Sequence, residues 1–373
     1  MPDKSKIYSN LQKIERKIIR VFNPNPVLED EASIQQQLDK DIQQQLDKDI
    51  AVNFGLWQPL PITYPGTGKG IKIGEKTYPS LAVASTALQD HQTLLIGEGV
   101  YTEPLVINRN HVQIIGSGRV VFDGASAEGK AAIITKGKQI TISNIECKNI
   151  AVADQNGACI RSEGAGLTVE HVYFHDSEQG ILSSNNQSLR ISDSRFEKLG
   201  KNGRAHGIYI DGGEVLIDHS WFIASKSEGH EIKSRASKTV IKNCVIASLS
   251  AVDSRLVDVS NGGELVIENS VLEKGPQSAN ATAIGYGLEG ITHQQNAIIL
   301  EKNVVILERD GHNVLLDARP EGQVPVKIVG NIIVSKDEQV IDGLNWLFSS
   351  RQEARMGEYP QLPVLENQQK PLK

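Results

Sequence analysis

The chain has 373 residues and 39% hydrophobic residues, enough to bury a large core, and its formal net charge of −6 gives no electrostatic reason to expect a nucleic-acid partner. No run of about 18 apolar residues is present, so we expect no membrane span. The N-terminus lacks a signal-peptide pattern, which predicts a cytoplasmic protein or one exported by another route. Isoleucine and valine lie in short runs between Gly, Asn, Asp and Ser, which favours many short strands.

The first part of the chain predicts helix. Apolar residues recur there at helical spacing, at Ile7, Leu11, Ile14 and Ile18. The octapeptide IQQQLDKD then occurs at 34–41 and again, unchanged, at 42–49. Its apolar residues recur every four residues, so they do not stay on one face of a helix with 3.6 residues per turn. We therefore expect a solvated helix without an active site, and a dimer contact is the alternative. We assign residues 1–55 to a helical N-terminal extension.

From Leu94 one pattern keeps returning: an aliphatic residue, two mostly polar residues, a small or apolar one and two apolar ones. Clear copies begin at Ile191, Ile217, Ile241 and Ile267. Counted from Ile114, the first aliphatic residue recurs at steps of 22 to 33 residues. Such a period is typical of a solenoid, whose coils bury their inner faces only by stacking. Leucine-rich frames are absent, so a parallel β-helix fits better.

Three runs resemble the entry coils of the pectin-lyase-like right-handed β-helix superfamily, namely Ile96–Glu103, Ile114–Gly118 and Phe122–Gly124. The resemblance covers roughly residues 90 to 340, and His206–Gly290 is similar to bacterial right-handed β-helix repeat proteins. It implies an all-β fold, a single-stranded right-handed parallel β-helix of about nine or ten coils. The superfamily hosts lyases, hydrolases, esterases, epimerases, adhesins and phage tailspikes, so the function stays open.

We place the β-helix at 56–342 and a C-terminal cap at 343–373. The segment around Trp346 is expected to cover the last coil, because an open end would expose strand edges. The longest step, between Ile267 and Leu300, predicts an inserted loop, and such loops often hold ligands.

The cysteines are Cys147, Cys159 and Cys244. They have no metal-like spacing, and an odd number does not suggest a disulfide framework. We interpret all three as small buried hydrophobic residues.

Reactive side chains concentrate in GHEIKSRAS, residues 229–237, where strand alternation predicts Glu231, Lys233 and Arg235 on one face. Aligning the aliphatic centres of successive coils predicts a ladder on one face: Tyr209, Lys233 and Asp258. The side chains predicted to surround it are His206, His230, Glu231, Arg235 and Arg255. An alignment error of one residue would reverse the faces.

This set of side chains suits β-elimination on an anionic polysaccharide: a cation or metal neutralises the uronate carboxylate, a base removes the α-proton and an acid protonates the leaving oxygen. We assign Lys233 as the base, Tyr209 or His230 as the acid, and Arg235 or Arg255 as the carboxylate ligand. The predicted substrate-binding residues are His206, Glu231, Arg255, Asp258 and Tyr286. Glu289 is the alternative to Tyr286 for a residue of segment 285–290 that reaches over the ladder.

A surface stack of ion pairs, worth about 0 to 1 kcal/mol, is the structural alternative to a site. The arrangement of Glu231–Ser234, with Arg255 one coil later, is similar to one found in the β-helical alginate and chondroitin lyases. The resemblance implies that Lys233 is a base that follows acidic calcium ligands. Glu231 stands nearly alone where that family has several ligands, so a bound Ca²⁺ is left open. Ile217–Ser220 resembles the Ile-Asp-His run of pectate lyases, but its repeat position matches Lys242–Asn243, which favours a turn ladder.

The sequence therefore predicts a carbohydrate-active enzyme, most simply a lyase, with an anionic polysaccharide or oligosaccharide as its partner. The alternatives are a non-catalytic glycan-binding or structural β-helix protein, like an adhesin or tailspike, and a polysaccharide hydrolase or epimerase. The acidic cluster of an inverting hydrolase and the paired aspartates of a pectin methylesterase are not found. The oligomeric state stays open.

Overall fold

The structure is a computed structural model that describes residues 62–184 and 188–356, and residues 36–38, 40, 41, 44, 45 and 48 of the N-terminal part. The chain divides into two units, Met1–Ala51 and Val52–Lys373. The described residues of the first unit are helical, while the helix expected at 5–20 lies outside the described residues. Within the described residues, no helix has the length and apolar character needed to cross a membrane.

The described part of the second unit begins with a small lid on the end of the solenoid. Strand β1 (Ile71–Ile73) pairs antiparallel with β2 (Lys76–Tyr78) and with β3 (Thr93–Tyr101). Helix α3 (Leu81–Ala87) follows, and its N-cap Ser80 accepts a hydrogen bond from Val83 N. The buried residues of this lid, Leu81 among them, join the same hydrophobic core as the coils, so the lid closes the first open end.

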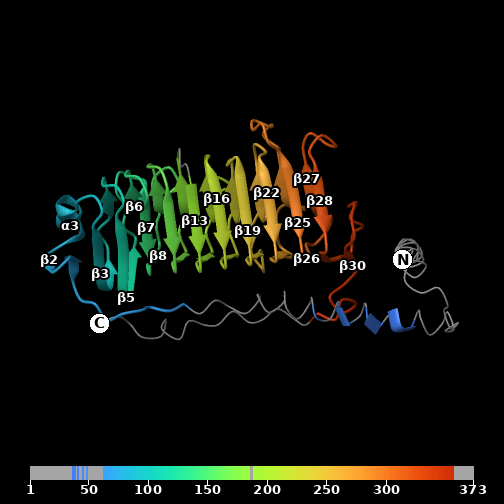
Figure 1. Cartoon of the computed structure of the whole chain (residues 1–373), viewed down its shortest axis with the longest axis horizontal. Coiled ribbons are helices and arrows are strands. Elements are labelled where there is room, and N and C mark those ends of the chain that lie inside the picture. The colour runs from blue at the N-terminus through green and yellow to red at the C-terminus, as the bar shows by residue number, and fades with distance from the viewer. Residues whose placement is uncertain are drawn as a thin grey trace, which may run out of the picture. The chain divides into compact units, whose positions relative to one another are not determined.

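The coils stack three rows of parallel strands along one axis (Figure 1). The first row holds β3, β5 (Gln113–Asp123), β7 (Ile140–Ser143), β10 (Leu167–Glu170), β13 (Ser188–Ser192), β16 (Glu214–Asp218), β19 (Lys238–Lys242), β22 (Glu264–Glu268), β25 (Ala297–Glu301) and β28 (Val326–Val329). The second row continues from the ends of β3 and β5 through β8 (Glu146–Lys148), β11 (Tyr173–His175), β14 (Arg195–Glu197), β17 (Trp221–Ile223), β20 (Val245–Ala247), β23 (Val271–Lys274), β26 (Val304–Leu307), β29 (Ile332–Ser335) and β30 (Trp346–Phe348).

The third row forms a separate sheet of nine strands within the described residues. It consists of β4 (Leu105–Ile107), β6 (Ala131–Thr135), β9 (Ala158–Ser162), β12 (Gln179–Ser183), β15 (Ile208–Ile210), β18 (Ile232–Ser234), β21 (Val257–Val259), β24 (Thr282–Tyr286) and β27 (Val314–Ala318). The expected all-β parallel β-helix is therefore confirmed.

Each coil buries its inward side chains by stacking them on those of its neighbours. In the second row the ring of Phe196 lies 4.5 Å from that of Phe222 and 5.5 Å from that of Phe174, measured between centroids. All three rings are buried, and burying a side chain of this size stabilises the fold by about 1.5–3 kcal/mol. Like residues recur at like positions because each coil contributes one layer to this column.

The turn between the first and second rows needs one residue with left-handed backbone. At this position lie Asp193, His219, Asn243 and Asn269, with φ between 42° and 53°. Asn and Asp tolerate this conformation better than other non-glycine residues, which explains their recurrence. Asp218 and His219 therefore belong to the turn ladder, as predicted.

Two features close the C-terminal end of the described solenoid. Strand β30 pairs in parallel with β29, so Trp346–Phe348 extend the second row by one strand. At the edge of β27, side chains replace the missing next strand: Asn313 N donates to Asp337 Oδ2 at 2.9 Å and Leu315 N to Gln339 Oε1 at 2.8 Å. The rest of the segment expected to cover the last coil, after residue 356, lies outside the described residues.

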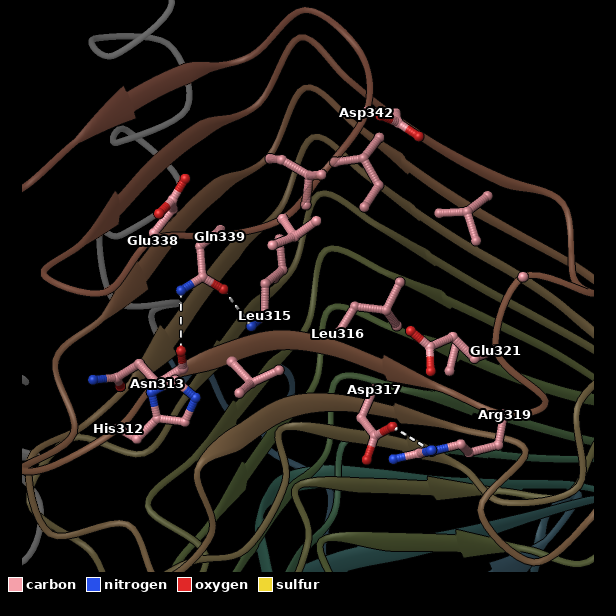
Figure 2. Close-up of a pocket in the computed structure, with 17 residues that line it drawn as sticks. His312, Asn313, Leu315, Leu316, Asp317, Arg319, Glu321, Glu338, Gln339 and Asp342 are labelled. Carbon is pink, nitrogen blue, oxygen red and sulfur yellow. Dashed lines mark hydrogen bonds and ion pairs between the residues drawn. The ribbon is translucent and has the colours of Figure 1, made fainter. Parts of the chain in front are cut away.

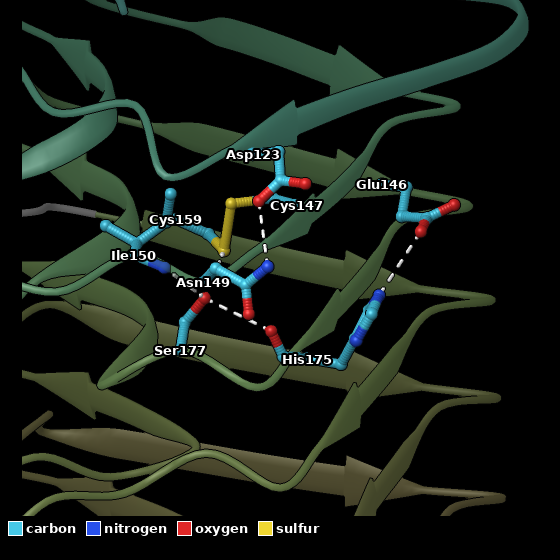
Figure 3. The surroundings of a disulfide bond; sticks show 8 residues. All are labelled: Asp123, Glu146, Cys147, Asn149, Ile150, Cys159, His175 and Ser177. Carbon is cyan, nitrogen blue, oxygen red and sulfur yellow. Dashed lines mark hydrogen bonds and ion pairs between the residues drawn. A yellow bond between two sulfur atoms is a disulfide. The ribbon is translucent and has the colours of Figure 1, made fainter. Parts of the chain in front are cut away.

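The interpretation of the cysteines is wrong for two of the three. Cys147 of β8 and Cys159 of β9 form a buried disulfide with a Cα–Cα distance of 5.8 Å (Figure 3). Cys244 is free and buried, as expected. The pairing follows from the coil itself, because the second and third rows of one coil approach each other at this corner. Spacing along the sequence does not reveal that proximity.

Candidate functional site

The predicted ladder stands in register on the third row. Tyr209 of β15 pairs with Lys233 of β18, and Lys233 pairs with Asp258 of β21. Their neighbours at the aliphatic centres, Ile208 and Ile232 among them, are fully buried in the core. Alternation therefore turns the ladder outward, with successive members about 4.8 Å apart. The predicted register is confirmed.

Ion pairs connect the ladder to its surroundings. Lys233 Nζ lies 3.2 Å from Asp258 Oδ2 and 2.9 Å from Glu289 Oε1. Arg255 Nη1 lies 3.5 Å from Asp258 Oδ1, and Arg235 Nε lies 3.2 Å from Glu289 Oε2. We name this set the Lys233 patch, consisting of Tyr209, Lys233, Arg235, Arg255, Asp258 and Glu289. Its three cations and two carboxylates leave a formal charge of +1.

Arg235 and Lys233 each have a further contact in the patch besides the one with Glu289. The guanidinium of Arg235 lies over the ring of Tyr209, 5.1 Å from the centroid, which is a cation–π contact. Asp258 is buried, and Ser260 Oγ donates to its Oδ2 at 2.7 Å. The serine was not predicted, although it follows the third-row strand in SNGG as a polar residue next to a predicted site. Arg235 is held by an aromatic platform and Lys233 by a buried carboxylate.

The two histidines form a buried stack beside the patch. The rings of His206 and His230 lie 4.8 Å apart, and each Nδ1 accepts a backbone N–H of the next coil, from His230 at 3.1 Å and from Arg255 at 3.0 Å. Burial and then the cations of Lys233 and Arg255 lower the pKa of His230 to about 3. Burial and His230 lower the pKa of His206 well below its ordinary value.

This geometry corrects the role expected for His230. A neutral ring whose Nδ1 already accepts a hydrogen bond carries its proton on Nε2, and that atom lies 3.7 Å from Asp258 Oδ2. His230 therefore binds the backbone of the next coil through Nδ1, and its Nε2 lies near Asp258 without a hydrogen bond to it. A general acid in the reaction needs an accessible proton, and both histidine rings are buried.

Glu231 does not share a face with Lys233, which corrects the alternation argument. Strand β18 begins only at Ile232, and the chain turns before it, so Glu231 points into the solenoid. Its oxygens accept hydrogen bonds from Ser225 N at 2.6 Å and Ser225 Oγ at 2.7 Å. Burial, and then the charge of Asp253, raise the pKa of Glu231 well above its ordinary value. Glu231 cannot meet a substrate from this position.

Tyr286 is also not a surface residue. It is fully buried, and its hydroxyl donates to Gly263 O at 2.5 Å and lies 3.1 Å from Asn296 Oδ1. In the register of β24 it pairs with the inward Val259, which explains why it faces the core. The residue of this segment that reaches the patch is Glu289, the alternative suggested by the sequence.

The Ca²⁺ that the sequence left open finds no matching ligands in the described part of the chain. No group of three or more His, Cys, Asp and Glu side chains is arranged there to hold a metal ion. Glu231 is enclosed by Ser225, and both carboxylates of the patch are paired with cations. These residues do not fit a calcium site, and we derive no step through one.

A cavity of about 610 Å³ lies elsewhere, at the C-terminal end of the third row (Figure 2). Its lining includes Asn313, Leu315 and Asp317 of the β27 region and the facing segment 338–342. The side chain of Asp317 pairs with Arg319 at 2.9 Å. The Lys233 patch contributes no residue to this cavity.

The three parallel rows and their turn ladder define a right-handed parallel β-helix protein. The model of a family described as "Right handed beta helix region" matches residues 105–246. A search of curated proteins finds no match.

Two solved structures illustrate the likeness. The alginate lyase of Paenibacillus sp. str. FPU-7 is 16% identical, with 72% of this chain and 96% of that chain covered and a TM-score of 0.50. The pectin methylesterase PemA of Erwinia chrysanthemi is 15% identical, with 82% of this chain and 98% of that chain covered and a TM-score of 0.42. At 16% identity, the likeness to the alginate lyase shows the fold alone.

Proposed function

We propose that this protein binds an anionic, uronate-containing polysaccharide along the third row and cleaves it by β-elimination. The observation that carries the proposal is the in-register ladder of Tyr209, Lys233 and Asp258, with Arg235 and Arg255 beside it. An extended polymer lying along the row meets side chains from several coils at once. The cations of the patch can pair with the carboxylates of such a polymer. The hydroxyl of Tyr209 and the amine of Lys233 are groups that can transfer protons.

The geometry suggests a division of roles. Arg235, whose side chain is 28% exposed, can take the uronate carboxylate in a bidentate hydrogen bond and so stabilise the enolate that forms. Lys233 Nζ contacts the carboxylates of both Asp258 and Glu289, and this arrangement suits charge stabilisation or proton donation better than the base role. Tyr209, next to it on the ladder, is then the candidate base.

The test is cleavage of a panel containing alginate, polygalacturonate and glycosaminoglycans, followed by the ultraviolet absorbance of the unsaturated product. Alginate belongs in the panel because one solved structure similar to this chain is an alginate lyase. We expect the absorbance to rise with at least one polymer. If no polymer yields unsaturated product or new reducing ends, cleavage of these substrates is refuted.

Replacing Lys233 tests its role. We expect Lys233→Ala to lower kcat by about 10²–10⁴-fold, the usual loss for a group that takes part in proton transfer, while Lys233→Arg keeps a measurable fraction because the charge remains. Lys242→Ala is the matched control, because Lys242 forms a comparable ion pair, 3.0 Å from Glu268, on the first row. Near-normal activity of Lys233→Ala would remove Lys233 from the mechanism.

One observation favours a non-catalytic glycan-binding protein as the second candidate. All three cations of the patch already pair with carboxylates, an arrangement that can hold a glycan without carrying out chemistry. Binding of a uronate oligosaccharide without any unsaturated product would select this alternative.

A further inference from the structure

The loop after β24 folds back across the third row. Glu289 N donates to Ser260 O at 2.9 Å and Thr292 N to Asn261 O at 3.0 Å, which ties the loop to the coil of β21. His293 Nε2 then lies 3.1 Å from Arg235 O, in the coil of β18. These contacts hold the loop in place without any help from the Glu289 side chain.

The Glu289 carboxylate nevertheless lies between the two cations of the ladder face. Its Oε1 accepts from Lys233 Nζ at 2.9 Å, and its Oε2 accepts from both Nε and Nη2 of Arg235, at 3.2 Å for Nε. Each oxygen therefore serves a different cation, as the two oxygens of a bound carboxylate ligand would. The side chain is 41% exposed, so it can turn into solvent while the loop backbone stays in place.

The Lys–Glu ion pairs on the first row provide a comparison for the contacts of Glu289. Lys238 and Glu264, 2.8 Å apart, form a pair with one cation for one carboxylate. Such exposed pairs contribute little to stability. Glu289 differs because it bridges two cations and because the backbone already fixes its loop, so loop stability does not explain why a carboxylate lies there.

We propose that Lys233 and Arg235 form the subsite for a uronate carboxylate and that Glu289 is its internal occupant. This rests on the function proposed above. A ligand carboxylate exchanges with the Glu289 carboxylate on both cations, and no covalent bond changes. Without Glu289 the subsite keeps its shape, because Asp258 still holds Lys233 and the ring of Tyr209 still supports Arg235. Removing the competitor from a preorganised site increases its affinity for ligand.

The experiment measures the Kd of saturated uronate trisaccharides by calorimetry, with mass spectrometry to confirm that the ligand is intact afterwards. We expect the Kd of the trisaccharide to be about tenfold lower for Glu289→Gln and Glu289→Ala than for the wild type. Glu264→Gln, the matched control, should leave Kd unchanged. A trisaccharide whose carboxyl groups have been reduced should show no gain, because the exchange requires a carboxylate.

Wild-type or weaker affinity in both Glu289 variants, with folding confirmed by circular dichroism, would overturn the inference. If the wild type cleaves a polymer and the variants still bind no more tightly, the inference alone fails. If neither the wild type nor the variants bind or cleave any uronate polymer, the proposed function fails as well. Tighter binding by the variants, with or without cleavage, supports the subsite.

Discussion

The residues of the site fall into two groups by solvent exposure. The exposed residues can contact a ligand, and the buried residues keep the exposed ones in position. Arg235 and Glu289 reach solvent and Lys233 is 12% exposed, whereas Asp258 and the two histidines are buried. The buried residues fix the exposed ones: Asp258 binds Lys233 and Arg255, and His230 Nδ1 accepts the backbone N–H of Arg255. Mutations of the buried group are therefore expected to affect geometry before chemistry.

Glu231 provides a test of the interior. Because burial raises its folded-state pKa, the unfolded chain releases its proton at a lower pH than the folded chain, and the free energy of unfolding falls as pH rises above about 4.5. We expect Glu231→Gln to be more stable than the wild type at pH 7, and we expect this difference to shrink as the pH falls toward 4. Denaturant unfolding at both pH values measures this.

Glu264→Gln, at a half-buried position on the first row, serves as the control substitution for Glu231→Gln. Equal stability of Glu231→Gln and the wild type at pH 7 would mean that Glu231 ionises freely inside the coil.

The three rows of strands differ in what they present to solvent. In the middle coils the second-row residues are buried on both faces, as Trp221, Phe222 and Ile223 show, whereas the first row carries simple Lys–Glu pairs. On the third row, Gly285 continues the ladder after Asp258, and a Cβ there would lie 2.6 Å from Arg255 Cδ. This glycine leaves room for Arg255 against Asp258, so the patch depends on a residue with no side chain.

The disulfide is the covalent link between two elements, β8 and β9 of one coil. We expect Cys147→Ser with Cys159→Ser to lower the free energy of unfolding by about 2–4 kcal/mol, because the cross-link restricts the unfolded chain. Denaturant unfolding measures the loss.

Thiol counting checks the same bond. Alkylation of the unfolded protein without reductant should modify Cys244 alone, and alkylation after reduction should modify three cysteines. Three modified cysteines without reductant would show that the bond is absent.

For the whole molecule, the stacking of coils explains which features the sequence could predict. Aliphatic residues that return once per coil predicted the solenoid and the register of Tyr209, Lys233 and Asp258, since each row repeats one local rule. The errors lie where the chain bends or crosses coils. Glu231 precedes its strand and turns inward, and Tyr286 faces the core, so that Glu289 instead reaches the patch across two coils. The pattern of neighbouring residues in the sequence does not predict a bend before a strand or a contact between distant coils.

The central claim is that the Lys233 patch holds the carboxylate of an anionic glycan. The most direct measurement is a crystal structure of the protein with a uronate oligosaccharide. We expect the sugar to lie along the third row, with a carboxylate on Lys233 and Arg235 and the Glu289 side chain displaced. An oligosaccharide bound at the cavity near Asp317, or anywhere else with Glu289 still on both cations, would contradict the account.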